Sequence, residues 1–124
     1  MSLDLPLLVE GELLATTSVT GTSANLTFEG KADTDSLNAL HDLLEKLHVE
    51  AVRLGIREVV FDFMRLAFMS SSGVKAFVNL VMRIQESPAE QRYKLRFKSN
   101  PDLRWQKRSL HALTCFATEL ITVE

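Results

Sequence analysis

The sequence feature that constrains the fold most is an apolar run followed by a helical pattern, within residues 57–85. The run is typical of a strand buried on both faces, and it consists of Val59, Val60, Phe61 and Phe63. Beyond it, apolar residues recur about every 3.6 positions, as along one face of an α-helix: Val74, Phe77, Val78, Val81 and Ile84. A short connector between the two patterns ends in three serines and a glycine. The stretch therefore predicts a strand, a loop and a helix with hydroxyl groups at its start.

Serine is favoured before a helix because its oxygen accepts a hydrogen bond from a backbone N–H of the first turn. The same N–H groups and the helix dipole make this end favourable for an anion. A phosphate ester on one of these serines would therefore be tolerated locally, and it would change the surface strongly.

The rest of the chain shows alternating strand and helix patterns. They predict, in order, a hairpin over 13–28 with its turn at 21–23 and its second strand broken at Gly30, a helix over 33–55, a strand over 92–98, a helix over 102–117 and a short closing strand over 120–123. Residues 1–9 are either a loose tail or an edge strand. Such alternation predicts an α/β sheet with crossover helices. Because residues 92–98 alternate between apolar and basic, we expect helices to cover one side of the sheet more fully than the other.

Length and composition indicate one soluble domain. A chain of 124 residues with 46% hydrophobic residues fits a single domain over 1–124 with a substantial core. The one cysteine, Cys115, excludes an internal disulfide and fits a reducing compartment. The N-terminus lacks the basic start of a signal peptide, and no apolar run approaches the ~20 residues that span a bilayer. We therefore expect a cytoplasmic protein without a membrane association.

Charge is distributed unevenly along the chain. Residues 1–51 contain nine acidic and two basic residues, whereas residues 52–124 contain seven acidic and twelve basic residues. Such a division can orient a partner with a matching charge pattern. It is equally compatible with two solvated surfaces that differ in charge.

The stretch VVFDFMRLAFMSSSGVKAFV (residues 59–78) resembles the STAS domain family, which includes anti-sigma factor antagonists and sulfate-transporter tails. In that family a strand ending in aspartate leads through a hydrophobic connector to Asp-Ser-Ser/Thr-Gly and a helix. Asp62 takes the strand position here, and Ser71, Ser72 and Gly73 match the two hydroxyl residues and the glycine. Ser70 departs from the pattern, because the family usually has aspartate there. A weaker match, LTFEGKAD (residues 26–33), resembles the family's strand and acidic loop before the first long helix.

The resemblance implies a fold and a role. The fold would be a single-domain, curved mixed sheet with crossover helices in the order β-β-α-β-α-β-α and an optional short final strand. The role would be partner switching by a binder that is not an enzyme and needs no cofactor. Unphosphorylated, the protein would bind a serine kinase of the anti-sigma type and release what that kinase holds, commonly a sigma factor. Phosphorylation would break the complex, and a serine phosphatase would reset it. Weak self-association remains open.

The same resemblance assigns site residues. Ser71 is the expected phosphoacceptor, with Ser70 or Ser72 as second choices. The loss of the usual aspartate at position 70 leaves open a different kinase, a changed interface or a module that no longer switches. The expected partner-binding residues are Asp33, Met69, Ser70, Ser71, Ser72, Gly73, Val74 and Lys75. Lys75 is a candidate counter-charge for a phosphate, and Asp62 is expected to cap or brace the connector at the end of its strand.

Two other roles compete with partner switching. In the first, the serines only cap the helix, and the protein is a constitutive interaction module that docks a larger regulatory assembly. In the second, the basic stretch 92–108 binds nucleic acid, with Tyr93, Phe97 and Trp105 stacking on bases. Tyr93 and Phe97 lie on the apolar face of the predicted strand, so we expect the core to use them.

Catalytic and metal-binding interpretations are weaker. A hydrolase triad of Ser71, His111 and Asp62 lacks the Gly-x-Ser-x-Gly elbow of such enzymes. His41, Glu45 and His48 share a helix face, but the two histidines lie two turns apart, about 10 Å. We therefore expect a solvated helix flank there and no metal site. No glycine-rich phosphate loop of a nucleotide-binding protein is present either.

Overall fold

The computed structural model describes residues 8–10 and 12–124, which form one six-stranded mixed sheet with three α-helices. The strands are β1 (Leu8–Glu10), β2 (Leu13–Thr20), β3 (Ser23–Ala32), β4 (Glu58–Met69), β5 (Lys94–Lys98) and β6 (Ile121–Val123). The helices are α1 (Leu37–Leu54), α2 (Ser71–Glu86) and α3 (Arg104–Phe116), with 3₁₀ turns at Thr34–Ser36 and Ala89–Gln91. The predicted α/β class and element order are confirmed, including the short closing strand.

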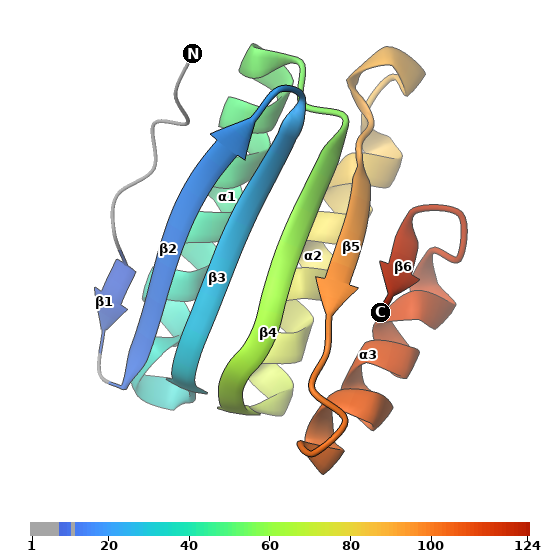
Figure 1. Cartoon of the computed structure of the whole chain (residues 1–124). Helices are drawn as coiled ribbons and strands as arrows, with labels where there is room; N and C mark the ends of the chain where they lie inside the picture. Colours follow the sequence, from blue (N-terminus) through green and yellow to red (C-terminus); the bar gives the residue numbers. More distant parts are fainter. Residues whose placement is uncertain (1–7, 11) are drawn as a thin grey trace.

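The strands lie side by side in chain order. Strands β1, β2 and β3 pair antiparallel, and the pairs from β3 to β6 are parallel, each joined by one helix. Both α1 and α2 lie across the same face of the sheet, and α3 lies beside β6 (Figure 1). The opposite face carries polar side chains on alternate positions, as expected for a sheet with one wet side. Residues 1–7, from the segment expected as a tail or edge strand, lie outside the described residues.

An aromatic cluster forms the centre of the core between the sheet and α2. The ring of Phe61 on β4 stacks on Phe97 of β5 at 5.2 Å between centroids and meets Phe77 of α2 edge-on at 5.1 Å. Phe28 of β3 and Phe63 of β4 complete the cluster at 5.6 Å from each other. All five rings are fully buried. This packing holds α2 against the sheet and so fixes where its first turn lies.

Two strands run further than the sequence predicts. The expected break at Gly30 is wrong, because β3 continues to Ala32 and Gly30 pairs with Leu13 at a φ of 91°. A side chain there would meet the Glu12 carbonyl oxygen, which lies 1.8 Å from the position of a Cβ. The connector after Asp62 is also strand, because β4 extends to Met69. Because glycine has no Cβ, the Glu12 carbonyl can approach Gly30 closely, and the chain stays in the sheet at a backbone conformation that would otherwise end a strand.

The extension of β4 is accommodated by two register shifts against β3, between Thr27 and Glu29 and between Gly30 and Lys31. Past Asp62, β4 no longer pairs with β5. The backbone carbonyls of β4 that no longer pair with β5 accept hydrogen bonds from side chains of α3 and of the turn before it. Gln106 Nε2 donates to Phe63 O at 2.6 Å and to Leu66 O at 3.1 Å, and Trp105 Nε1 also donates to Leu66 O, at 3.2 Å. Helix α3 therefore stabilises the strand end that leads to the serines.

Candidate functional site

Two loops meet at the carboxyl ends of β3 and β4. We call residues 70–72, which follow β4, the serine loop, and the turn that begins at Asp33, after β3, the Asp33 loop. Ala32 and Met69 are the last paired residues of these two parallel strands. The backbone N–H of Ser70 then donates to the carbonyl of Ala32 at 2.9 Å. Asp33 follows Ala32 directly, so the structure brings the Asp33 loop and the serine loop together. The sequence match at residues 26–33 and the one at 59–78 thus belong to one local region.

Ser70 is the N-cap of α2. Its backbone is extended, with φ −69° and ψ 164°, and its Oγ accepts a hydrogen bond from Gly73 N at 3.1 Å. Serine and aspartate are about equally good at this position, because either side chain supplies the accepting oxygen. The departure at Ser70 therefore keeps the cap and removes a negative charge.

Ser71 is the first residue of α2, and its side chain is exposed. Ser72 and Val74 are half-buried, and Val74 packs against the core. Lys75 is exposed one turn into the helix. Among the three serines, Ser71 is therefore the most accessible from solvent, and Ser70 already uses its oxygen in the cap.

Met69 and Gly73 lie beneath this surface. The side chain of Met69 is only 4% exposed. A Cβ on the buried Gly73 would lie 2.6 Å from Met69 Cγ. Both residues are buried beneath the loop and support it from below, and their predicted contact with a partner stays a prediction. The exposed part of the expected set is smaller: Ser71 and Lys75, with Ser70, Ser72, Val74 and Asp33 half-buried.

Asp33 is held by its own loop. Its Oδ1 accepts from Asp35 N at 3.2 Å, and its backbone N–H donates to Ser36 Oγ at 3.1 Å. Ser36 also donates to Asp33 O, so this serine, at the N-cap of α1, turns back to the loop and makes no cap hydrogen bond to the helix. The loop therefore presents Asp33 in a defined position next to the serines.

Asp62 braces the strand extension, as the sequence predicts, although the strand does not end there. Its Oδ1 accepts from Met64 N at 3.0 Å, at the first register shift. Past the shifts, Phe68 points outward and is 44% exposed, two residues before Ser70. The sequence interpretation missed Phe68, because an apolar residue in a hydrophobic connector gives no sign of which side it faces. Only the pairing register decides that.

The residues of the hypothetical hydrolase have separate partners. Asp62 is bonded to Met64 N, and His111 Nε2 lies 3.8 Å from Cys115 Sγ on α3. Across residues 8–10 and 12–124, no hydrogen bond joins Ser71, His111 and Asp62, and no group of three potential ligands could hold a metal ion. Tyr93 and Phe97 are fully buried, which confirms that the core uses these aromatics.

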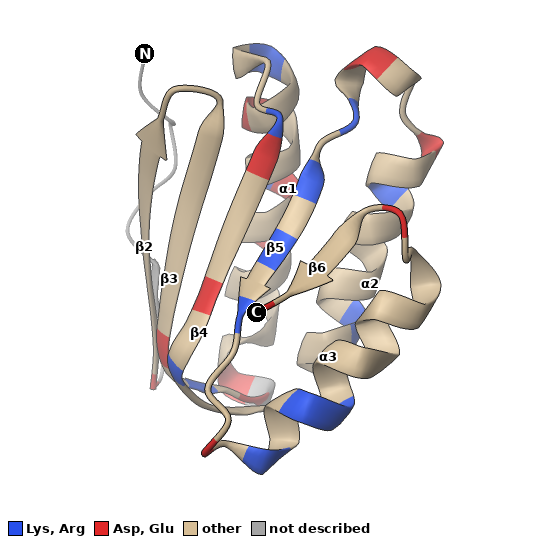
Figure 2. Ribbon diagram, turned by 45° about the vertical axis from the view of Figure 1, so that its right-hand side comes forward, with Lys and Arg blue, Asp and Glu red and all other residues tan. Residues whose placement is uncertain are grey.

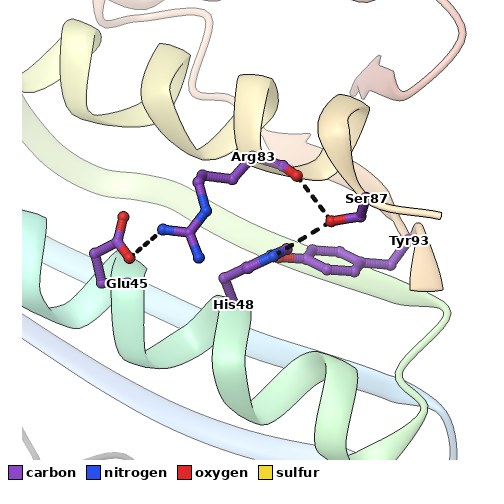
Figure 3. A network of polar contacts seen from close by, with 5 residues as sticks. All are labelled: Glu45, His48, Arg83, Ser87 and Tyr93. Atoms are coloured by element: carbon purple, nitrogen blue, oxygen red, sulfur yellow. Dashed lines mark hydrogen bonds and ion pairs between the residues drawn. The ribbon is translucent and has the colours of Figure 1, made fainter.

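A buried polar network at the other end of α2 was also missed (Figure 3). His48 was expected on a solvated flank, but this is wrong, since it is only 7% exposed. Ser87 Oγ donates to Arg83 O at 2.8 Å and lies 3.5 Å from His48 Nε2. His48 Nδ1 lies 2.8 Å from the Tyr93 hydroxyl. Neutral His48 fits this arrangement, with its Nε2–H donating to Ser87 and its Nδ1 accepting from Tyr93.

The surroundings of the network favour its neutral form. Burial lowers the pKa of His48 below its ordinary value of 6.5, and the Arg83 guanidinium lowers it further, whereas Glu45 opposes the effect. Burial likewise raises the pKa of the Tyr93 hydroxyl. Glu45 and Arg83 form an ion pair beside the two rings. The only sign of this network in the sequence is Tyr93 on the apolar face of its predicted strand, because the hydroxyl of a buried tyrosine needs a hydrogen-bond partner.

The fold is that of the anti-sigma factor antagonists. A crystal structure of an anti-sigma factor antagonist from Mycobacterium paratuberculosis matches with a TM-score of 0.62 and 14% identity, over 88% of this chain and 84% of that one. The anti-sigma factor antagonist SpoIIAA, in its unphosphorylated form, matches with a TM-score of 0.51 and 21% identity, over 89% of this chain and 87% of that one. These matches confirm the STAS-like fold expected from residues 59–78.

A further match is to the crystal structure of Mglu, with a TM-score of 0.53 and 22% identity, over 71% of this chain but 20% of that longer chain. No protein-family model matches the sequence, and no curated protein does so. Within the part of the chain that the structure describes, no helix is both long and apolar enough to cross a membrane.

Proposed function

We propose that the protein is a partner-switching regulator of the anti-sigma factor antagonist kind, switched by phosphorylation of Ser71. In its unphosphorylated form it binds a serine kinase that acts as an anti-sigma factor. The contact surface consists of the Ser71 loop, the first turn of α2 and the adjoining Asp33 loop. The observation that carries the proposal is the exposed Ser71 hydroxyl at the first position of α2, beside Asp33. The protein is then a substrate and a binder, and not a catalyst.

The switch would be electrostatic. A phosphoserine carries about −1.5 to −2 charges at pH 7. A partner shaped for a neutral hydroxyl would have to bury that charge without a matching cation, which costs several kcal/mol. This corresponds to a loss of affinity of roughly a hundredfold or more. A serine phosphatase then restores the binding form.

The phosphorylated form can keep its fold. The phosphate would lie at the positive end of the α2 dipole, where negative charge is favourable. Lys75 lies one turn further along and is exposed, so its ammonium group can approach the phosphate. Phe68, exposed beside the loop, offers apolar contact area that the unphosphorylated form would bury against its partner. Phosphorylation would therefore change binding without unfolding the domain.

The phosphorylation step is tested by mass spectrometry. The protein is incubated with ATP and with the anti-sigma-type kinase that it captures from cells of its source. Trypsin cleaves after Arg65 and Lys75, so all three serines fall in the single peptide 66–75. We expect one phosphoryl group on this peptide, located at Ser71 by fragmentation and lost in Ser71→Ala. A peptide that stays unmodified, or one modified only at Ser70 or Ser72, would contradict the assignment to Ser71.

The binding step is tested with Ser71→Asp. We expect this added charge to weaken the complex with the same kinase by roughly a hundredfold in calorimetry. Ser18→Asp, which adds the same charge at an exposed position on β2, is the control and should bind like the wild type.

The second candidate is a constitutive interaction module, and the hydrogen bond from Gly73 N to Ser70 Oγ favours it, since a cap alone would account for that serine. In this case Ser71→Asp binds as tightly as the wild type, and the peptide 66–75 stays unmodified. The two candidates therefore give opposite results in both experiments.

A further inference from the structure

Helix α3 presents a basic surface outside the serine loop. Its first turns carry Arg104, Lys107 and Arg108, all exposed, and His111 follows one turn later. Figure 2 shows the basic residues gathered in these turns of α3. We call these four residues the α3 basic face.

The cations of this face have no acidic partner within the described residues. The basic residues that take part in ion pairs there are Lys31, Arg53, Arg65, Arg83 and Arg96. Helix α3 itself contains no acidic residue, from Arg104 to Phe116. The chain as a whole has a net charge of −2, so these unpaired cations do not reflect an excess of basic residues.

The placement of these cations does not serve the helix. The N-terminal end of a helix carries a positive partial charge, so cations there are unfavourable and acids are favourable. In α3 the first turn holds no acid, and its N-cap, Leu103, supplies no side-chain hydrogen bond. A charge pattern that works against its own element is typical of a functional surface.

A groove with an apolar floor borders this face. A cavity of about 710 Å³ lies between α3, the turn before it and β6. Leu103, Leu110 and Val123 contribute apolar walls, and Lys107 and His111 stand among the lining residues. Val123 lies on the outermost strand of the sheet and is 40% exposed. The groove thus combines apolar area with positive charge at its rim.

We propose that this groove binds an acidic polypeptide segment of a partner protein, with apolar side chains on the floor and carboxylates against the α3 basic face. Charge complementarity of this kind fixes the orientation of a partner and speeds its association. None of the residues that line the groove belongs to the serine loop, so we expect a partner to dock here whatever the state of Ser71.

The aromatic residues argue against a nucleic acid as the occupant. Base stacking needs exposed rings, but Tyr93 and Phe97 are fully buried. Trp105 is half-buried against Phe63, with its indole N–H bound to Leu66 O.

Fluorescence anisotropy tests the proposal with two labelled probes, a short amphipathic peptide of glutamate and leucine and an oligo-dT strand. We expect the acidic peptide to bind the wild type, and Lys107→Glu/Arg108→Glu to weaken it by about tenfold or more. Lys46→Glu/Arg57→Glu, which makes the same charge change at two exposed positions elsewhere, should keep the wild-type affinity. Val123→Ser should weaken the peptide severalfold without changing any charge, and Ser71→Asp should have no effect.

Four results would overturn the proposal. The first is no binding of the acidic peptide at millimolar concentration, and the second is an equal loss in both double variants, which would mean unspecific attraction. The third is tighter binding of oligo-dT than of the peptide at the same salt concentration. The fourth is self-association of the wild type that Lys107→Glu/Arg108→Glu abolishes, which would make a second copy of this chain the occupant. Circular dichroism of each variant verifies that it is folded.

Discussion

Ser70 is the residue on which the geometry of the serine loop depends most directly, through its hydroxyl and its backbone N–H. It satisfies the N–H of Gly73, and the backbone of the same serine is tied to Ala32 at the end of β3. These two hydrogen bonds leave Ser71 free at the surface. Capping and exposure are thus divided between neighbouring serines.

The capping role predicts a stability difference between variants. Ser70→Ala should lower the free energy of unfolding by about 1 kcal/mol, because one N–H of the first turn loses its acceptor. Ser70→Asp should keep the wild-type stability within about 0.5 kcal/mol, since aspartate caps as well as serine does. Urea denaturation followed by circular dichroism measures both. Ser71→Ala is the control, and a loss at position 71 as large as that at position 70 would show that the cap is assigned to the wrong serine.

At the scale of elements, the long strand β4 depends on α3. Its first half is paired on both sides, but past Asp62 the edge toward β5 is open. The amide of Gln106, which is fully buried, fills this position from α3. The end of β4, and the loop that follows it, are therefore held by an element more than thirty residues away in the sequence.

This dependence can be tested with Gln106→Leu, which keeps the approximate size of the side chain. The variant leaves the buried carbonyl of Phe63 without its donor, so we expect a loss of about 2 kcal/mol in the free energy of unfolding. Hydrogen exchange should also quicken in the second half of β4. Lys107→Leu, the neighbouring exposed position, should change stability by less than about 0.5 kcal/mol. Equal effects at the two positions would argue against a specific role of the amide.

At the scale of the whole molecule, the network of His48, Tyr93 and Ser87 joins α1, the end of α2 and the segment before β5. It lies at the end of α2 opposite to the serines. Protonation of His48 would place a hydrogen on Nδ1, facing the hydroxyl that donates to it. The protonated state is therefore disfavoured only in the folded molecule.

This predicts a pH dependence of global stability. The unfolded chain takes up a proton on His48 near pH 6.5, whereas the folded chain does so only at lower pH, because its pKa is lowered. Stability should be constant above pH 7 and should fall as the pH drops below 6.5, by at most about 1.4 kcal/mol per pH unit for this one proton. Urea denaturation at a series of pH values measures the slope. His48→Gln should reduce it, whereas the exposed His111→Gln should not; an unchanged slope in His48→Gln would refute the assignment.

The sequence predicts the order of elements because strand and helix periodicities are local, and the described sheet follows them. It places the serines at the start of α2 because the capping pattern is local as well. It fails where partners distant in the chain decide: Gly30 stays in β3 because Glu12 approaches it, and Phe68 faces solvent because of two register shifts. The burial of His48 likewise depends on Tyr93, 45 residues away. None of these three features produces a periodic pattern in the sequence, so periodicity could not predict them.

The neutral cap at position 70 has one more consequence. In a loop that begins with an acid, the resting form already repels acidic neighbours, and a modification only strengthens that repulsion. Here residues 70–74 carry no ionisable side chain, so the unmodified serine loop adds no negative charge to that of the neighbouring Asp33, and it repels a partner's carboxylates less than an acidic loop would. Contrast between the two states would then come entirely from the added group, and a carboxylate on the partner would serve as the sensor that reads it.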